Sequence, residues 1–144
     1  MIEHVIYIAT TPDRLWEALT NNADLKEYWG DIQSTWAAGS GIAELDAAGK
    51  RLWQGDVLRN EPPRILAYTF DTGDEIASEI TFELRAPDTL VQPGNSIVCL
   101  TLSQAGLPEN SSTYNACKHA WPEILSSLKT YLETGRPLGF LWKN

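Results

Sequence analysis

The sequence has little of three things, and each shortage argues against a class of protein. Its two cysteines, Cys99 and Cys117, match neither a disulfide framework nor the ligand spacing of a zinc site. Its 11 Lys and Arg residues are outnumbered by 19 Asp and Glu residues, and the formal net charge is −8. This charge repels nucleic acids and anionic membrane surfaces, so neither is expected as a partner.

Long apolar runs are also missing. No run approaches the length of about 18 residues that a membrane-spanning helix needs, and the N-terminus lacks the pattern of a signal peptide. We therefore expect a cytoplasmic protein in which both thiols stay reduced. A chain of 144 residues fits a single domain, residues 1–144, which can bury a core without disulfides or metals.

Tryptophan, by contrast, is abundant, with six residues among 144. An indole ring buries a large apolar area and carries one N–H donor that needs a partner when it is buried. The composition therefore indicates either a large aromatic core or a pocket that is lined by aromatic rings.

The clearest helical pattern covers residues 111–135. Apolar residues recur there in alternating steps of three and four, which places them on one stripe of a helix. The stripe consists of Tyr114, Cys117, Trp121, Leu125, Leu128 and Leu132. Pro122 lies inside the pattern and costs about 3 kcal/mol in an ordinary helix interior. Because the stripe keeps its phase across the proline, we favour one helix from Ser111 with a bend before Trp121; a helix that begins at Pro122 is the alternative.

The N-terminal part combines one strand with two short helices. Residues 2–9 are rich in β-branched and aromatic residues and predict a strand, although the pattern leaves its inward face open. A threonine cap followed by Pro12 begins a helix that ends at Asn21. A second helix over residues 23–28 ends at Gly30.

The middle of the chain predicts a run of antiparallel strands. The expected strands cover residues 32–36, 42–45, 51–60, 64–70, 76–85 and 96–103. Gly55 lies inside one of them and predicts a bulge or the close approach of another group. Alternation directs one set of residues inward: Leu66, Tyr68, Phe70, Ile76, Ser78, Ile80, Phe82, Leu84, Val98, Leu100 and Leu102. Cys99 falls on the opposite, outward face.

These elements together predict an α+β fold. A sheet with one apolar face and a helix with one apolar stripe must be buried against each other. We therefore expect a curved antiparallel sheet of about six strands wrapped around the long C-terminal helix, with a cavity between them.

Several segments resemble a known family. Residues 15–20 with Trp29 look like its first helix pair, and residues 55–57 followed by 61–66 look like its central strand and Pro-Pro turn. Residues 121–135 look like the end of its closing helix. The chain thus resembles the START-like (SRPBCC, helix-grip) superfamily and, within it, the family similar to the C-terminal domain of the activator of the heat-shock protein 90 ATPase. The resemblance covers nearly the whole chain and implies a helix-grip fold.

The resemblance implies a range of functions. Members of the superfamily bind lipids, sterols, polyketides or hormones under the long helix, and some are cyclases or aromatases. The eukaryotic co-chaperones of the family carry a further N-terminal domain that is absent from this sequence, which argues against activation of a chaperone ATPase. A hydrophobic or aromatic small molecule is therefore the first partner expected, and a chaperone contact is the weaker expectation.

Patterns for catalysis and metal binding are scarce. His4 and His119 have no His, Asp or Cys cluster around them in the sequence, so both are expected to be structural or exposed. No serine or cysteine lies in a nucleophile elbow, and no glycine loop resembles a phosphate cradle. The sequence therefore predicts no catalytic residue, no metal ligand and no cofactor.

The aromatic residues are the candidates for a ligand site. Trp16 and Trp29 lie on the apolar faces of the short helices and are assigned to the core. The residues expected to line the cavity are Trp36, Trp53, Tyr68, Phe70, Ile80, Phe82, Leu100, Tyr114, Cys117, Trp121 and Leu125. Their indole and phenol groups would bind either the polar end of a ligand or backbone carbonyls.

Three hypotheses of function follow. The first is a non-enzymatic protein that binds a small apolar or aromatic molecule, with the half of the closing helix before Pro122 as the roof of the cavity. The second is a protein-interaction module, either co-chaperone-like or a homodimer. Its contact surface would include the tail residues Leu138, Phe140, Leu141 and Trp142. The third is an enzyme of cyclase or hydrolase type, which needs a polar group inside the cavity.

Overall fold

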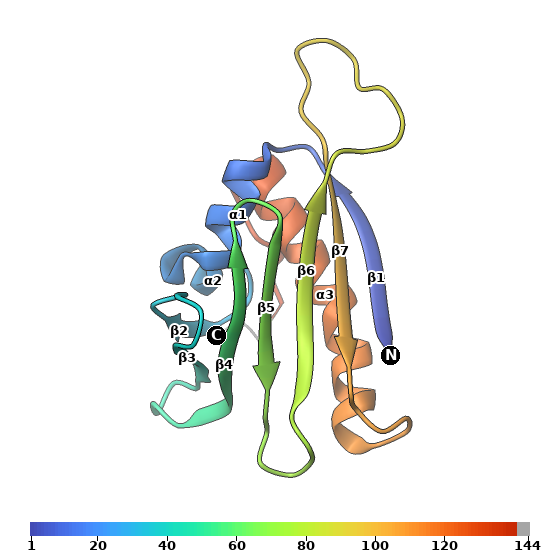
Figure 1. The fold of residues 1–144 in the computed structure, drawn as a ribbon. Helices are drawn as coiled ribbons and strands as arrows, with labels where there is room; N and C mark the ends of the chain where they lie inside the picture. The colour runs from blue at the N-terminus through green and yellow to red at the C-terminus, as the bar shows by residue number, and fades with distance from the viewer. Residues whose placement is uncertain (141–144) are drawn as a thin grey trace.

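A computed structural model describes residues 1–140 as a curved antiparallel sheet with helices packed behind it (Figure 1). Within these residues the strand order is β1-β7-β6-β5-β4-β3-β2, so the first strand lies beside the last. The strands are β1 (Ile2–Ile8), β2 (Asp31–Ser34), β3 (Gly41–Leu45), β4 (Arg51–Glu61), β5 (Ile65–Phe70), β6 (Ser78–Arg85) and β7 (Val98–Ala105). The helices are α1 (Pro12–Thr20), α2 (Asn22–Tyr28) and α3 (Ser112–Thr134). The α+β helix-grip fold is confirmed, with seven strands in place of about six.

The helix ends follow the capping chemistry of the sequence. The Thr11 side chain accepts a hydrogen bond from the backbone N–H of Arg14, and the Asn21 side chain accepts two from the first turn of α2. Ser111 caps α3 in the same way, and Gly135 ends it in the left-handed conformation with φ 85°. These local signals explain why the boundaries of the helices are close to those predicted.

Helix α3 runs without interruption through Pro122, so one helix that contains the proline is confirmed and the shorter alternative is wrong, while the bend before Trp121 stays a prediction. Pro122 is exposed, whereas its neighbours Trp121 and Leu125 are buried. Packing of the apolar stripe on both sides of the proline offsets the loss of one backbone hydrogen bond.

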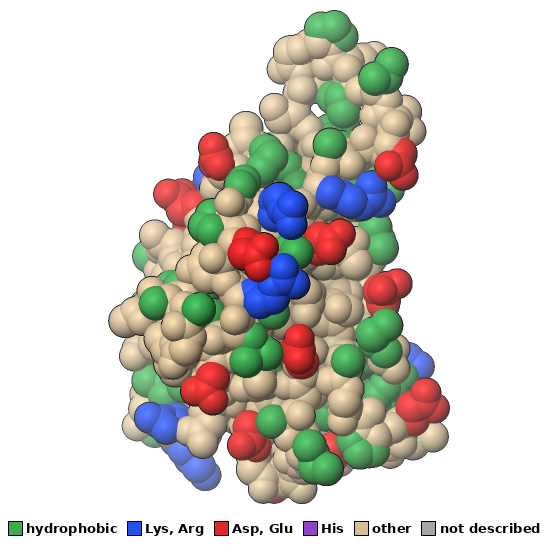
Figure 2. Space-filling view, viewed as in Figure 1, with side chains coloured by type: hydrophobic (Ala, Val, Ile, Leu, Met, Phe, Trp, Pro, Cys, Tyr) green, Lys and Arg blue, Asp and Glu red, His purple; other side chains and the backbone are tan. Residues whose placement is uncertain are grey.

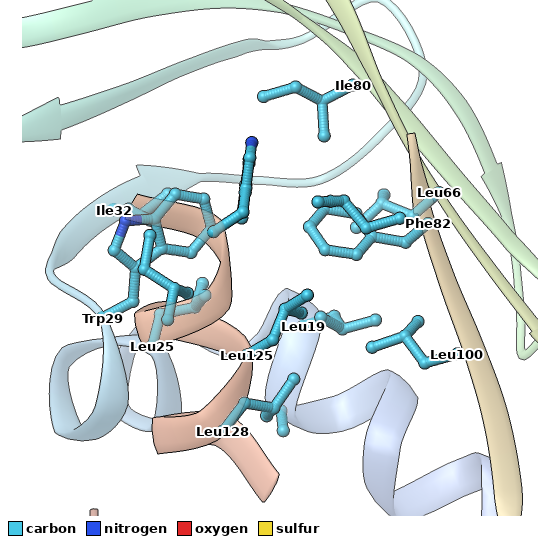
Figure 3. Packing of buried hydrophobic residues seen from close by; sticks show 14 of the residues in the cluster. Leu19, Leu25, Trp29, Ile32, Leu66, Ile80, Phe82, Leu100, Leu125 and Leu128 are labelled. Atoms are coloured by element: carbon cyan, nitrogen blue, oxygen red, sulfur yellow. The ribbon is translucent and has the colours of Figure 1, made fainter. Parts of the chain in front are cut away.

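The core lies between the inner face of the sheet and α3. Figure 3 shows Leu125 and Leu128 of α3 facing Phe82 and Leu100 of the sheet, with Leu19 of α1 beside them. Fully burying a side chain of this size contributes about 1.5–3 kcal/mol. The second half of α3 therefore seals the core, as the leucine stripe predicts.

Two predictions from the strand patterns are wrong. Ile76 is 82% exposed, because β6 begins only at Ser78 and the strand pattern does not reach it. Trp36 lies in the loop after β2 rather than in a strand. Cys99 lies on the outer side of β7, as predicted, and is buried there because its small side chain lies between the longer Tyr7 and Arg85 of the neighbouring strands.

Trp36 has a left-handed backbone conformation, with φ 68°. This conformation is strained for a residue with a side chain and persists only where the surroundings hold it. Here the Ser34 hydroxyl accepts from the Trp36 backbone N–H at 2.9 Å, and the Asn60 side chain donates to its carbonyl at 2.6 Å. The Trp36 indole N–H donates to Asn22 Oδ1 at 3.2 Å. Together these bonds turn the indole ring inward.

The close approach predicted at Gly55 is confirmed. A Cβ atom at this position would overlap the backbone carbonyl of Thr69 on β5, so only glycine fits. The Thr69 hydroxyl accepts a hydrogen bond from the backbone N–H of Asp56 at 2.8 Å. Strands β4 and β5 thereby approach closely at this point.

A polar network ties the short helices to the second half of α3. Arg14 of α1 donates two hydrogen bonds to the Asp24 carboxylate, at 2.9 and 3.0 Å. The Tyr131 hydroxyl of α3 donates to the same carboxylate at 2.6 Å. The Arg14 guanidinium holds the pKa of Asp24 below its ordinary value.

The outer face of the sheet carries charges of both signs. Figure 2 shows acidic and basic side chains interspersed with apolar ones over this face. Within the described residues, no helix combines the length and apolar character that a membrane span requires. Of the predicted contact tail, Leu138 and Phe140 are half-buried, whereas Leu141 and Trp142 lie outside the described residues.

Candidate functional site

Seven aromatic rings meet on the inner face of the sheet, and we call them the aromatic cluster. Its members are Trp29, Trp36, Trp53, Tyr68, Phe70, Phe82 and Trp121. The centroids of neighbouring rings lie between 4.9 and 6.3 Å apart. Such pairs contribute about 0.5–1.5 kcal/mol each beyond their buried area. The cluster therefore stabilises the curved end of the sheet as well as shaping the space beneath α3.

Five of these rings form a closed circuit. Trp29 contacts Trp53 and Trp121, with centroid distances of 6.2 and 5.2 Å. Trp53 stacks on Tyr68 at 5.8 Å, and Phe82 completes the circuit by contacting both Tyr68 and Trp121 at 6.0 Å. Trp29, which caps the end of α2, thus joins residues of β4, β5, β6 and α3 in one set of ring contacts.

The structure brings the predicted ligand residues to one side of the sheet. Trp36, Trp53, Tyr68, Phe70, Phe82 and Trp121 belong to the aromatic cluster. Ile80, Leu100 and Leu125 are buried beside it, Cys117 is buried on the first half of α3, and Tyr114 is partly buried there. Most of these side chains are in contact with one another. Their role in binding a ligand stays a prediction.

A pocket of about 420 Å³ opens beside this cluster, and we call it the side pocket. It lies between the first half of α3, the end of α2 and strand β3. Its lining residues are Trp29, Glu44, Ala116, His119, Ala120, Glu123 and Ile124. Ala116, Ala120 and Ile124 are spaced by four and so lie along one face of α3. The two alanines leave room that larger side chains would fill.

Glu44 places a carboxyl group in the wall of the side pocket. It lies on β3, where it is paired across the sheet with Ile32 on one side and Trp53 on the other. The Trp53 indole N–H donates to Glu44 Oε1 at 2.8 Å. On the other side, a Cβ atom at Gly30 would overlap Glu44 Oε2. The lack of a side chain at Gly30 therefore makes space for the carboxyl group.

The surroundings of Glu44 favour its neutral form more than water does. Burial raises the pKa of the Glu44 carboxyl, the Trp53 N–H partly opposes this rise, and the charge of Asp31 adds to it. Burial also raises the pKa of the Tyr68 hydroxyl, and the negative charge of Glu44 adds to that rise. A carboxyl with a raised pKa in a pocket is a typical functional-site candidate.

The indole of Trp121 is satisfied within the protein. Its N–H donates to Gln104 Oε1 at 2.8 Å, and the Gln104 amide donates to Ser78 Oγ at 3.0 Å. Burial raises the pKa of the nearby Cys117 thiol, which keeps it in the unreactive protonated form. The polar groups of Trp121 and Gln104 are therefore used in contacts within the protein.

The two histidines occupy different places. His119 is exposed at the mouth of the side pocket, whereas His4 is half-buried on β1 and does not line it. Among residues 1–140, no group of three or more His, Cys, Asp or Glu residues has an arrangement that would hold a metal ion.

A larger hollow of about 720 Å³ lies on the outer face of β3, β4 and β5. Polar residues such as Gln54, Asp56 and Thr69 line it. None of the predicted ligand residues lines this hollow or the side pocket. The side pocket combines an aromatic wall, Trp29, with the partly buried carboxyl of Glu44, and for this reason we take it as the candidate site.

Sequence reasoning missed the most distinctive residue of this pocket. Ile42 and Glu44 share one parity on β3, so a buried Ile42 directs Glu44 inward as well, and this signal was available. Trp29 is buried as predicted, but it also lines the pocket. Ala116 and Ala120 carried no signal of their own, because an alanine next to an apolar stripe is typical of any helix.

Comparison with known proteins agrees with this architecture. The family model described as Activator of Hsp90 ATPase homolog 1-like protein matches residues 9–133. Among curated proteins, none matches the sequence.

Solved structures are also similar. The solution structure of the Aha1 dimer from Colwellia psychrerythraea is 25% identical with a TM-score of 0.74, and the match covers 93% of this chain and 96% of that one. A protein from Mesorhizobium loti is 24% identical with a TM-score of 0.70, covering 92% and 97%. CalU16 from Micromonospora echinospora is 18% identical with a TM-score of 0.71, covering 95% and 76%.

Proposed function

The chain belongs to the Activator of Hsp90 ATPase homolog 1-like family, and from this premise we propose that it binds a small, mainly apolar molecule in the side pocket. The observation that carries the proposal is a pocket of about 420 Å³ with Trp29, Ala116, Ala120 and Ile124 as its apolar wall. Ligand pockets are commonly about 300–1,000 Å³ and mostly apolar, with a few polar groups that orient the ligand. Glu44 is such a group.

The fold gives this pocket a rigid floor. Trp29 is held by ring contacts with Trp53 and Trp121, and the Trp53 indole in turn holds Glu44. A ligand that enters therefore meets preorganised groups, which lowers the entropy cost of binding.

The test fills the pocket without cutting into the core. Ala120→Leu adds bulk to the pocket wall, whereas Ser126→Leu adds the same side chain at an exposed position of α3. A dye that fluoresces in apolar cavities should bind the wild type and Ser126→Leu alike, and should bind Ala120→Leu about tenfold more weakly or not at all. Absence of dye binding to the wild type, or equal binding by all three proteins, would refute the proposal.

A second candidate function is self-association through β1. The structure similar to this chain from Colwellia psychrerythraea is a dimer, and β1 is an edge strand of the sheet. Val5 and Tyr7 on its outer face are 49% and 50% exposed, which leaves apolar area for a second copy. Sedimentation velocity of the wild type and of a Val5→Lys variant tests this, and a wild type that stays monomeric at high concentration refutes it.

The other expectations remain predictions. An enzyme of cyclase or hydrolase type needs a polar group inside the cavity, and Glu44 meets that requirement without identifying a reaction. Contact with a chaperone rests on the family name alone.

A further inference from the structure

The partly buried carboxyl of Glu44 has no cationic partner among the described residues. The ion pairs in residues 1–140 involve other acids, and Glu44 receives only the neutral N–H of Trp53. Removing a carboxylate from water is costly unless a positive charge or several donors compensate. The side pocket thus presents an acceptor with room for a charged partner.

The wall next to Glu44 also suits a positive charge. Trp29 lines the same pocket, and the face of an indole attracts ammonium groups more strongly than other aromatic faces do. A carboxylate beside an indole combines charge attraction with the cation–π interaction, and both strengthen where water is excluded.

The surroundings of the pocket are negatively charged, as Glu44 is. Glu123 of α3 lies at the mouth, Asp31 of β2 is near enough to raise the pKa of Glu44, and the chain has a net charge of −8. These charges attract cations and repel anions on approach. His119 of α3 also lines the mouth of the pocket, and Tyr68 of β5 is neutral at ordinary pH because burial raises the pKa of its hydroxyl.

We propose that the ligand of the side pocket is an organic ammonium compound. Its charged head lies between the Glu44 carboxylate and the face of Trp29, and its apolar body lies along Ala116 and Ala120 of α3. The inference rests on the proposed function, because it specifies the chemistry of the molecule that the side pocket takes.

The experiment uses two probes of the same shape and different charge. They are (4-hydroxyphenyl)trimethylammonium and 4-tert-butylphenol, whose heads differ only in a positively charged nitrogen in place of a carbon. Their dissociation constants at neutral pH are measured by calorimetry on the full chain. The wild type should bind the ammonium probe about tenfold more tightly than the neutral one.

Three proteins are compared. Glu44→Gln keeps an oxygen that accepts from Trp53 and should bring the two dissociation constants to within about twofold of each other. Glu79→Gln removes the same charge from an exposed position on β6 and should keep the wild-type preference. Near-UV circular dichroism checks that the aromatic cluster is intact in both variants.

The outcomes separate the two proposals. If the wild type binds both probes equally, the ammonium inference is wrong while the proposed function stands. A preference for the cation that survives Glu44→Gln refutes the assignment of Glu44. If neither probe nor the cavity dye binds the wild type, the proposed function itself is lost.

Discussion

The two halves of α3 differ in what lies beside them. Before Pro122 the wall-forming residues include Ala116 and Ala120, and a pocket opens beside them. After Pro122 the inward residues are Leu125 and Leu128, which are buried in the core. One continuous helix thus borders the side pocket from Ala116 to Ile124 and seals the core with the leucines that follow the proline.

The halves also differ in how they are fastened. The second half is tied to β1 by Lys129, which donates to the Tyr7 carbonyl at 2.7 Å, and by Glu133, which accepts from the Ala9 N–H at 2.8 Å. Tyr131 binds Asp24 from the same half. The first half contacts the sheet mainly through Trp121 and its bond to Gln104. Regions that bind ligands are commonly the less strongly fastened ones, so the contrast fits a site in the first half.

The largest effect is expected in the sealed half. Leu128→Ala removes a fully buried side chain and should lower the free energy of unfolding by about 2–5 kcal/mol. Urea denaturation measures the change. The half-buried Leu132 is the matched control, and Leu132→Ala should cost clearly less. Equal losses at the two positions would contradict the comparison.

An intermediate effect is expected where the second half is fastened. Asp24→Asn replaces the carboxylate that binds Arg14 and Tyr131, and should lower the free energy of unfolding by about 1–2 kcal/mol, since Arg14 is partly exposed. Asp24 has a lowered pKa, so its contribution is present above its unfolded pKa of about 4 and is lost as the pH falls. The difference between the proteins should therefore shrink in acid, and a constant difference would count against this account.

The smallest effect on stability is expected at the side pocket, and it is a gain rather than a loss. The folded state raises the pKa of Glu44, so its favourable contribution is present below the ordinary carboxyl pKa and is lost as the pH rises through the raised value. Glu44→Gln does not titrate and should gain stability relative to the wild type between acid and neutral pH. Thermal melts at both pH values measure this, and parallel pH profiles would show that burial does not penalise the charge.

The fold could be predicted because its signals are local. The Ser111 cap, the unbroken stripe of α3 and the glycine after Thr134 depend on residues close in sequence, as does the alternation from Ser78 to Leu84. The position of Trp36 could not, since its left-handed conformation depends on Asn60, which is 24 residues away.

The pocket was harder to predict than the fold. Its walls come from α2, β3 and α3, and no local pattern states which face of α3 meets which strand. The aromatic residues predicted as lining lie together but are largely occupied with each other. The parity that Glu44 shares with Ile42 was visible in the sequence, but its contact with Trp53 and the space left by Gly30 were not.

The closed circuit of five rings has a spectroscopic consequence. Three of its members are indoles in contact, so their electronic transitions interact, and the near-ultraviolet circular dichroism should reflect the whole circuit. Trp29 belongs both to this circuit and to the wall of the side pocket. A ligand that rests on Trp29 should therefore change the signal of the entire circuit, which makes the unlabelled protein an optical sensor of its own occupancy.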